Sequence, residues 1–520
     1  MKRRQFIQAG ALSLAAVAGA GALASCTSSG GGNKSGGPTK ITMLVLGDKP
    51  TNGRYQAMLE KLNPRLTEQA NVTLDFFFVE WADWQTQYNV QLLAGDSSID
   101  LISTATDWLF AWENAKKGAF LPLTEEMLQK NAPKTWAQVN SKGHWDLCKL
   151  DGKIYFAPED NYTQWTNHGF FYRGDWATAA GIPNGTITKD EQLTTYFQWV
   201  KSNKAGVYPL DVAATNESAL TSYLQGHTGN QTIQQVSASS YYPFQTTEFD
   251  PYSITSWYME GDDLVQAANQ AKKWNDIGVW REDALNYSGD TRSEFFAGKS
   301  GADQHHTQTF VGAIWSGMTT KQPGSDPKMY WFGQENHNIF RDIKTHGAMA
   351  VSANSKNPEK ALQFYDLIRN DKTDYMLLSY GIEGTDYVLT SAGKLDYPAG
   401  YDSSKDGLGT DFWAGRMDEF EPVRATDDPD KYAVYSKLNS ISKDYPYSTL
   451  FFNKDAIDPT LAAIGGVLAQ YVPQLEFGKF GDPAKAITEM RGKLAAAGWA
   501  DAVKSLQADM DKWAKAKGLK

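Results

Sequence analysis

Cysteine is scarce in this sequence. Only 2 of the 520 residues are cysteine, and these are Cys26 and Cys148. Cys26 lies at the end of an N-terminal apolar segment, where a Gly/Ser tract begins. If Cys26 is modified there, Cys148 has no partner, so we expect no internal disulfide. The default role of Cys148 is then that of a small buried hydrophobic residue.

Signals of several other functional classes are also missing. The chain has no GxxxxGK[ST] loop, so we do not expect it to hydrolyse ATP itself. Lysine and arginine number 50 against 60 aspartate and glutamate residues, which gives a formal net charge of −10. An acidic chain is a poor candidate for nucleic-acid binding. No internal repeat of short period is evident.

The first 25 residues have the pattern of an export signal. Lys2, Arg3 and Arg4 form a basic start, and residues 6–23 are apolar and rich in alanine and glycine. This order is typical of a secretory signal peptide. The apolar segment is too short and too glycine-rich to predict a transmembrane helix. The basic start, RRQFI, also resembles a twin-arginine signal, so the export route stays open.

The end of this signal contains LASC at residues 23–26. This sequence resembles a bacterial lipobox. The resemblance implies that Cys26 receives a diacylglycerol and becomes the new N-terminus, with residues 1–25 removed. Two acyl chains are enough to hold a protein on a membrane. Residues 26–40 then form a flexible Gly/Ser-rich tether. The alternative is an ordinary secretory peptide in which the cysteine occurs by chance.

The chain beyond the tether predicts an α/β fold. Short apolar runs at residues 41–49 and 72–80 predict strands, and residues 55–70 have helical spacing, with a kink or break at Pro64. Residues 84–104 predict a helix, a turn and a third strand. Alternating strands and helices indicate a parallel sheet covered by helices. The remaining length of the chain exceeds what one core can organise, so two lobes are expected.

Seven segments carry a family resemblance. In chain order they are LLAGDSSIDLIST, KKGAFLPLTEEM, DGKIYFAPED, GFFYRGDWATAAGI, FFAGKSGA, AMAVSANSKNPEKALQFYDLI and YGIEGTDYVL. They resemble segments of the family 1 extracellular solute-binding proteins of ABC importers. The last three resemble its large LplA-like lipoprotein branch. The match extends over most of residues 41–520.

This resemblance implies a type II periplasmic-binding-protein fold, with two α/β lobes, a ligand cleft and a hinge crossed by more than one strand. Lobe one is expected at residues 41–158 and 330–380. Lobe two is expected at residues 159–329 and 381–520. The resemblance also implies a monomer on the extracytoplasmic face of the membrane, which captures an oligosaccharide and delivers it to an ABC permease. A peptide or another non-sugar solute in the same fold is the alternative.

A sugar site needs flat aromatic platforms beside polar side chains, because sugars present apolar C–H faces and a rim of hydroxyl groups. The chain is rich in tryptophan, with 17 residues. Polar and aromatic residues follow each of the first three predicted strands, where an α/β sheet places its ligand-facing loops. The candidates in lobe one are Asp48, Trp81, Trp84, Asp107 and Trp108. For Trp81 and Trp84, packing in the core beneath a helix is the alternative.

Further candidates lie beyond the first crossing between the lobes. They include polar and aromatic residues at that crossing, in the polar run of lobe two, and near the second crossing. They are Glu159, Asp160, Tyr162, Trp165, Trp257, Asp303, His305, Trp331, Glu335 and Trp413, with Arg416 close to the last. A solvated linker is the alternative for the group that begins at Glu159. Burial in the core is the alternative for Trp257.

Catalytic and metal-binding interpretations are weaker. Glu159 and Asp160 are paired carboxylates, but neighbours in sequence rarely flank a glycosidic bond from both sides. His305 and His306 with Asp303 are a weak zinc pattern, because adjacent residues on a strand point to opposite faces. The run YDSSKDGLGTD departs from a calcium loop. We therefore expect a binding protein with no catalytic activity, no cofactor and no metal.

Overall fold

The computed structural model describes residues 37–520 except 82–83, 163–167, 213–218, 238–240, 288, 342 and 411. The predicted signal peptide, Cys26, most of the predicted tether and Trp165 lie outside the described residues. The first strand begins at Thr39, so it includes the last two residues of the predicted tether. No helix among the described residues combines the length and the apolar character that a membrane crossing requires.

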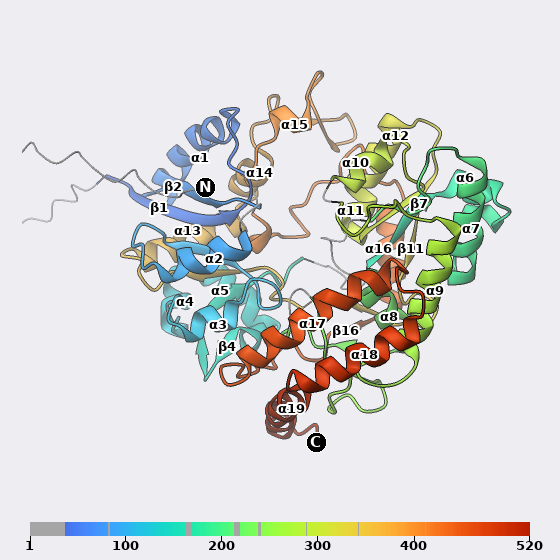
Figure 1. Ribbon diagram of the computed structural model, residues 1–520. Helices are drawn as coiled ribbons and strands as arrows, with labels where there is room; N and C mark the ends of the chain where they lie inside the picture. The colour runs from blue at the N-terminus through green and yellow to red at the C-terminus, as the bar shows by residue number, and fades with distance from the viewer. Residues whose placement is uncertain are drawn as a thin grey trace, which may run out of the picture. The chain divides into compact units, whose positions relative to one another are not determined.

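A five-stranded sheet organises the first part of the chain (Figure 1). In spatial order its strands are β2 (Val72–Val79), β1 (Thr39–Leu46), β3 (Leu101–Thr104), β13 (Ala348–Val351) and β6 (Phe156–Pro158). Strand β1 pairs in parallel with β2 and with β3, which confirms the predicted parallel sheet for these three strands. Strand β13, from much later in the chain, runs antiparallel to β3 and β6.

Helices bury this sheet because β1, one of its inner strands, is apolar on both faces. Met43, Leu44 and Val45 of β1 are all fully buried, as expected for a strand covered on both sides. Helix α1 presents Met58, Leu62 and Leu66 to the core at helical spacing. The predicted break at Pro64 does not occur, since α1 is continuous through that residue. The helices of this part are α1 (Arg54–Ala70), α2 (Trp84–Leu93), α3 (Ala111–Lys116), α4 (Glu125–Asn131), α5 (Pro133–Ser141), α13 (Pro358–Asn370) and α14 (Lys372–Tyr380).

A second sheet has three antiparallel strands in the order β10 (Ala302–His306), β7 (His168–Arg173) and β11 (Pro327–Trp331). Neighbouring residues of β7 point into different cores: Phe170 belongs to one apolar cluster and Phe171 to another. This period of two follows from strand geometry. The helices here are α6 (Gly174–Ala179), α7 (Asp190–Asn203), α8 (Ala219–Thr228), α9 (Asp263–Ile277), α10 (Thr291–Phe296), α11 (Thr307–Thr309) and α12 (Trp315–Lys321), with a π-helical turn at Phe310–Ile314.

The C-terminal region is helical. Helices α17 (Asp458–Glu476) and α18 (Pro483–Ala496) pack against each other and against α9, and α19 (Trp499–Ala516) packs on both (Figure 1). Before them lie α15 (Ser403–Asp406), a 3-10 turn at Trp413–Gly415, α16 (Lys431–Ile441) and strand β16 (Ser442–Asp444). The remaining described elements are short: 3-10 turns at His144–Cys148 and Pro183–Gly185, and strands β4 (Lys149–Leu150), β5 (Lys153–Ile154), β8 (Gln231–Thr232), β9 (Gln245–Thr246), β12 (Ile339–Arg341), β14 (Val388–Leu389) and β15 (Leu395–Asp396).

The cores draw on separated parts of the chain. The apolar cluster around the five-stranded sheet takes its buried residues from 41–157, 348–378 and 412–417. Trp331 belongs instead to a cluster on the three-stranded sheet. Cys148 is buried in the first cluster, as predicted for a small hydrophobic residue. The division into two lobes at the predicted boundaries stays a prediction.

Candidate ligand-binding site

Trp108 lies at the centre of an aromatic group. Its ring stacks on Trp81 at 6.3 Å between centroids and meets Trp84 edge-on at 5.4 Å. Trp413 lies 5.2 Å away and the ring of His346 lies 6.2 Å away. Trp81 is 44% exposed, whereas Trp413 is 7% exposed. The tryptophan group, defined as these four tryptophans, therefore has one solvent-facing side and one buried side.

Parallel strands bring these residues together. Strands β2 and β3 flank β1, so the residues that follow their carboxyl ends meet at one edge of the sheet. Asp48 follows β1, and its Oδ1 accepts a hydrogen bond of 3.1 Å from the backbone N–H of Trp81. Trp108 comes four residues after the end of β3. The structure thus gathers all five candidates of the first lobe at one edge, as the sequence predicts.

A partly buried polar contact lies directly beside the tryptophan group. Asp107 Oδ2 is 2.7 Å from Nδ1 of His346. The indole Nε1 of Trp108 donates to the backbone carbonyl of His346 at 3.0 Å. The other carboxylate oxygen of Asp107 is buried and has no hydrogen-bond partner among the described residues. This oxygen is an acceptor that a ligand hydroxyl would satisfy.

A charged pair stands next to this contact. Arg416 donates from Nε to Glu159 Oε1 at 2.7 Å and from Nη2 to Oε2 at 3.1 Å. The backbone N–H of Glu159 donates to the carbonyl of Gly347, the residue after His346. The guanidinium lies 3.9 Å from the ring centroid of Tyr162. Burial raises the pKa of Glu159 despite the opposing charge of Arg416, and burial raises the pKa of Tyr162 to about 12.

Asp160, the neighbour of Glu159, has a different environment. Its Oδ1 accepts a hydrogen bond of 2.6 Å from Arg369, and both side chains are fully buried. His144 contacts the other oxygen at 3.0 Å. Burial raises the pKa of Asp160, but the hydrogen bond from His144 and the charge of Arg369 outweigh that effect and leave the pKa lowered. These contacts are those of a structural ion pair, so Asp160 is not part of the proposed site.

Three histidines gather at one end of the three-stranded sheet. The rings of His168 and His305 stack at 5.9 Å, and those of His305 and His306 are 4.4 Å apart. The expectation that His305 and His306 point to opposite faces is wrong, because rings on opposite faces could not come so close. The His306 side chain turns to accept a hydrogen bond from the backbone N–H of Thr309 at the start of α11. Burial, with His168 nearby, lowers the pKa of His305 to about 3. Burial also lowers the pKa of His306. Four neighbouring basic groups lower that pKa further: His305, His168, His346 and Arg416.

The other candidates lie apart from the tryptophan group. Asp303 is 2% exposed, and its Oδ1 accepts from the backbone N–H of Gln304 at 2.7 Å. Trp257 is 2% exposed and packs in the core beside α9, so core packing describes its position. Trp331 is also buried, and its Nε1 donates to Thr307 at 2.9 Å. Glu335 is exposed and contacts a different set of residues.

Sequence reasoning missed His346 and His168. His346 precedes β13, and only the insertion of that strand beside β3 brings it to Asp107. His168 opens β7 and pairs in register with His306. Only one feature of the sequence pointed to His346. It lies two residues before the apolar run AMAV, which opens one of the segments that carry the family resemblance.

Comparison with known proteins agrees with this fold. Residues 49–375 match the family described as "Bacterial extracellular solute-binding protein", and residues 446–515 match a domain of unknown function, DUF3502. A "Carbohydrate ABC transporter substrate-binding protein" of Streptococcus pneumoniae is 22% identical over 508 residues, which is 94% of each chain.

Two solved structures place the fold in the same group. The N-glycan transport solute binding protein (NgtS) of Streptococcus pneumoniae in complex with Man1GlcNAc has a TM-score of 0.68 at 19% identity, covering 92% of this chain and 100% of that one. An HMO-binding solute binding protein of Bifidobacterium longum infantis has a TM-score of 0.63 at 14% identity, covering 92% and 99%. The family match spans more than half of the chain. The chain therefore belongs to the bacterial extracellular solute-binding proteins, which work outside the cytoplasm and bind solutes rather than transform them.

Proposed function

We propose that this protein is the substrate-binding component of a carbohydrate ABC transporter and that it captures an oligosaccharide. The carbohydrate transporter protein of Streptococcus pneumoniae, similar over 94% of both chains, supports the solute class. The observation that carries the proposal is the tryptophan group with Asp107 and the Glu159–Arg416 pair beside it. A sugar presents an apolar face to an aromatic ring and hydroxyl groups to charged acceptors and donors, and these residues offer both.

The residues divide this recognition between them. Trp81 and Trp108 supply stacked aromatic surface, part of it exposed. The unpartnered oxygen of Asp107 supplies an acceptor. Burying about 50–100 Å² of sugar surface on an indole ring stabilises the complex by about 1–2.5 kcal/mol. Charged hydrogen bonds add about 1.5–3 kcal/mol each and determine which hydroxyl groups fit.

The mechanism that we propose is closure of two lobes around the ligand. In this proposal lobe one is residues 41–158 and 330–380, and lobe two is residues 159–329 and 381–520. Two exceptions follow from the cores: the buried residues within 412–417 belong to the core of the five-stranded sheet, and Trp331 belongs to a core on the three-stranded sheet. Hinge closure around a ligand is a general mode of domain motion. In this mechanism closure brings the ligand-contacting residues of the two lobes together only when the solute is bound. Small-angle scattering should then show a smaller radius of gyration with saturating ligand.

The chain also carries the features of an anchored lipoprotein, and we assign it to the LplA-like branch. In this proposal residues 1–25 are removed, Cys26 bears the lipid, and the monomer stays on the extracytoplasmic face of the membrane near its permease. The LASC sequence and the Gly/Ser tract that follows it support this assignment.

The decisive experiment is a thermal-shift screen of the full chain against sugars, oligosaccharides and peptides, followed by calorimetry. A ligand that binds only the native state raises the melting temperature. The Trp108→Ala variant should bind the best sugar about tenfold to a hundredfold more weakly, since about 1.4 kcal/mol is one decade. Tyr432→Ala is the control, because Tyr432 is 58% exposed and belongs to α16. Stabilisation by peptides alone would refute the sugar proposal and favour the non-sugar alternative.

A further inference from the structure

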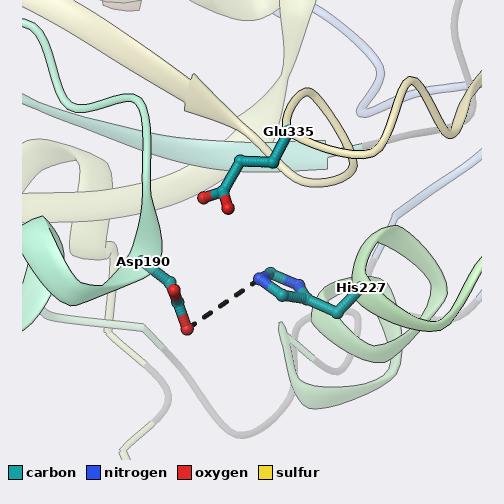
Figure 2. A group of neighbouring side chains, drawn as sticks. All are labelled: Asp190, His227 and Glu335. Carbon is teal, nitrogen blue, oxygen red and sulfur yellow. Dashed lines mark ion pairs between the residues drawn. The ribbon is translucent and has the colours of Figure 1, made fainter.

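Three side chains from separate elements converge away from the tryptophan group (Figure 2). Asp190 begins α7, His227 lies near the end of α8, and Glu335 follows β11. One ligand atom from each lies within 4.8 Å of the other two. Nε2 of His227 is 3.9 Å from Oδ2 of Asp190. The three residues form the Asp190–His227–Glu335 group, which the sequence did not indicate.

His227 is held in a tautomer that leaves one nitrogen available. Its Nδ1 lies 2.9 Å from the backbone carbonyl oxygen of Tyr223. A carbonyl can only accept, so Nδ1 carries a proton and Nε2 is the ring nitrogen that faces the two carboxylates. Nε2 is buried and has no hydrogen-bond partner among the described residues. An unpartnered nitrogen between two carboxylates has the arrangement of a metal ligand, because a metal-bound histidine commonly donates its other N–H to a carbonyl.

Both carboxylates are oriented by tyrosines. The hydroxyl of Tyr223 donates to Oδ2 of Asp190, and the hydroxyl of Tyr330 donates to Oε1 of Glu335 at 2.9 Å. The ring of Tyr223 also stacks on His227. Outer contacts of this kind fix metal ligands in place.

The charges of the group also call for a cation. Asp190 and Glu335 bring two carboxylates to one imidazole. Within the part of the chain that the structure describes, neither carboxylate forms an ion pair with a lysine or an arginine. One imidazole nitrogen with two carboxylates suits zinc and other first-row transition ions, whereas calcium and magnesium prefer oxygen ligands alone. We propose that this group binds a divalent transition-metal ion, with zinc as the representative ion.

The geometry fits such an ion after a small adjustment. Zinc bonds of about 2.0–2.2 Å require ligand atoms closer together than the group now holds them. Glu335 is exposed, so its side chain can rotate inward while Asp190 and His227 stay in place. Three protein ligands leave a fourth position for water, as an open zinc site does. The bound ion would connect the start of α7, the end of α8 and the turn after β11, and would stabilise that part of the fold.

The test uses the full chain, purified without a histidine tag, stripped with a chelator and titrated with Zn²⁺ by calorimetry. We expect one ion per chain and a higher melting temperature with zinc. His227→Gln and Glu335→Gln should each weaken zinc binding at least tenfold. His337→Gln is the matched control, because His337 is exposed, lies two residues from Glu335 and is outside the group.

Cobalt provides a second readout. Co²⁺ bound with nitrogen and oxygen ligands in low coordination should give visible absorption. This absorption should be lost in Glu335→Gln. That variant should stay folded, because Glu335 is exposed. Absence of saturable zinc binding would overturn the proposal, as would equal affinity in wild type, His227→Gln and Glu335→Gln. Neither readout involves a sugar, so the result is independent of the proposed carbohydrate function.

Discussion

Asp107 and His346 are 239 positions apart in the chain, yet Oδ2 of Asp107 lies 2.7 Å from Nδ1 of His346. The contact forms because β13 runs antiparallel beside β3, so the residues just before β13 reach the residues just after β3. The same turn holds the indole of Trp108 through the carbonyl of His346. A single strand insertion therefore orients both the acceptor and the aromatic platform of the proposed sugar site.

We predict that Asp107→Asn weakens sugar binding about tenfold to a hundredfold, because a hydrogen bond to a charged acceptor contributes about 1.5–3 kcal/mol. Calorimetry with the best sugar measures the change. His346→Asn and the double variant complete a mutant cycle. The two effects should be less than additive, since the residues are in direct contact. Unchanged affinity in Asp107→Asn would remove this residue from the site.

Two tryptophans should respond in opposite ways to truncation. Trp81 is 44% exposed and Trp257 is 2% exposed. Trp81→Ala should therefore lower sugar affinity and leave the apo melting temperature nearly unchanged. Trp257→Ala should lower the free energy of unfolding by about 3–5 kcal/mol, as expected for a buried aromatic residue, and leave the affinity of the folded fraction unchanged. Melting curves and calorimetry on both variants check the pair, and a large stability loss in Trp81→Ala would place it in the core.

The sequence predicted contacts between loops that follow neighbouring parallel strands, but not contacts between distant parts of the chain. The apolar runs of β1, β2 and β3 predicted a parallel sheet, and loops after such strands must meet at one edge, so Trp81 and Trp108 were found together. For Trp257 the sequence left a site residue and a core residue as alternatives, because the choice depends on packing against residues remote in sequence. The AMAV run of β13 gave no sign of its antiparallel direction, so His346 was missed. The Asp190–His227–Glu335 group was missed for the same reason, since each member comes from a separate element.

Lipid attachment can be tested with the two cysteines of the chain. We predict that Cys26→Ala abolishes incorporation of labelled palmitate and leaves the chain as an unprocessed precursor. Cys148→Ala is the natural control, because Cys148 is buried in the core and should take no lipid. Gel fluorography of membrane fractions after metabolic labelling reads both results. Label retained by Cys26→Ala would mean that the LASC sequence is not a lipobox.

The last prediction concerns the pH dependence of stability. Burial raises the pKa of Asp303 from 3.8 to about 7. In the native protein this carboxyl therefore holds its proton over a range in which the unfolded chain has lost it. Stability then falls as the pH rises from about 4 to about 7, because the native state binds more protons there. With about 1.4 kcal/mol per pKa unit, the ionised form costs up to about 4 kcal/mol above pH 7.

Asp303→Asn should remove this cost. We expect the variant to be about as stable as wild type near pH 4 and clearly more stable at pH 8, measured by urea unfolding at both values. His305, whose pKa is lowered to about 3, contributes the opposite slope, with stability lost as the pH falls below about 6.5. That contribution is common to both proteins and cancels in their difference. Asp146→Asn is the control, because the Asp146 side chain is 67% exposed and should shift stability equally little at both pH values. If Asp303→Asn were no more stable than wild type at pH 8, the buried carboxyl would have to be stabilised in its ionised form.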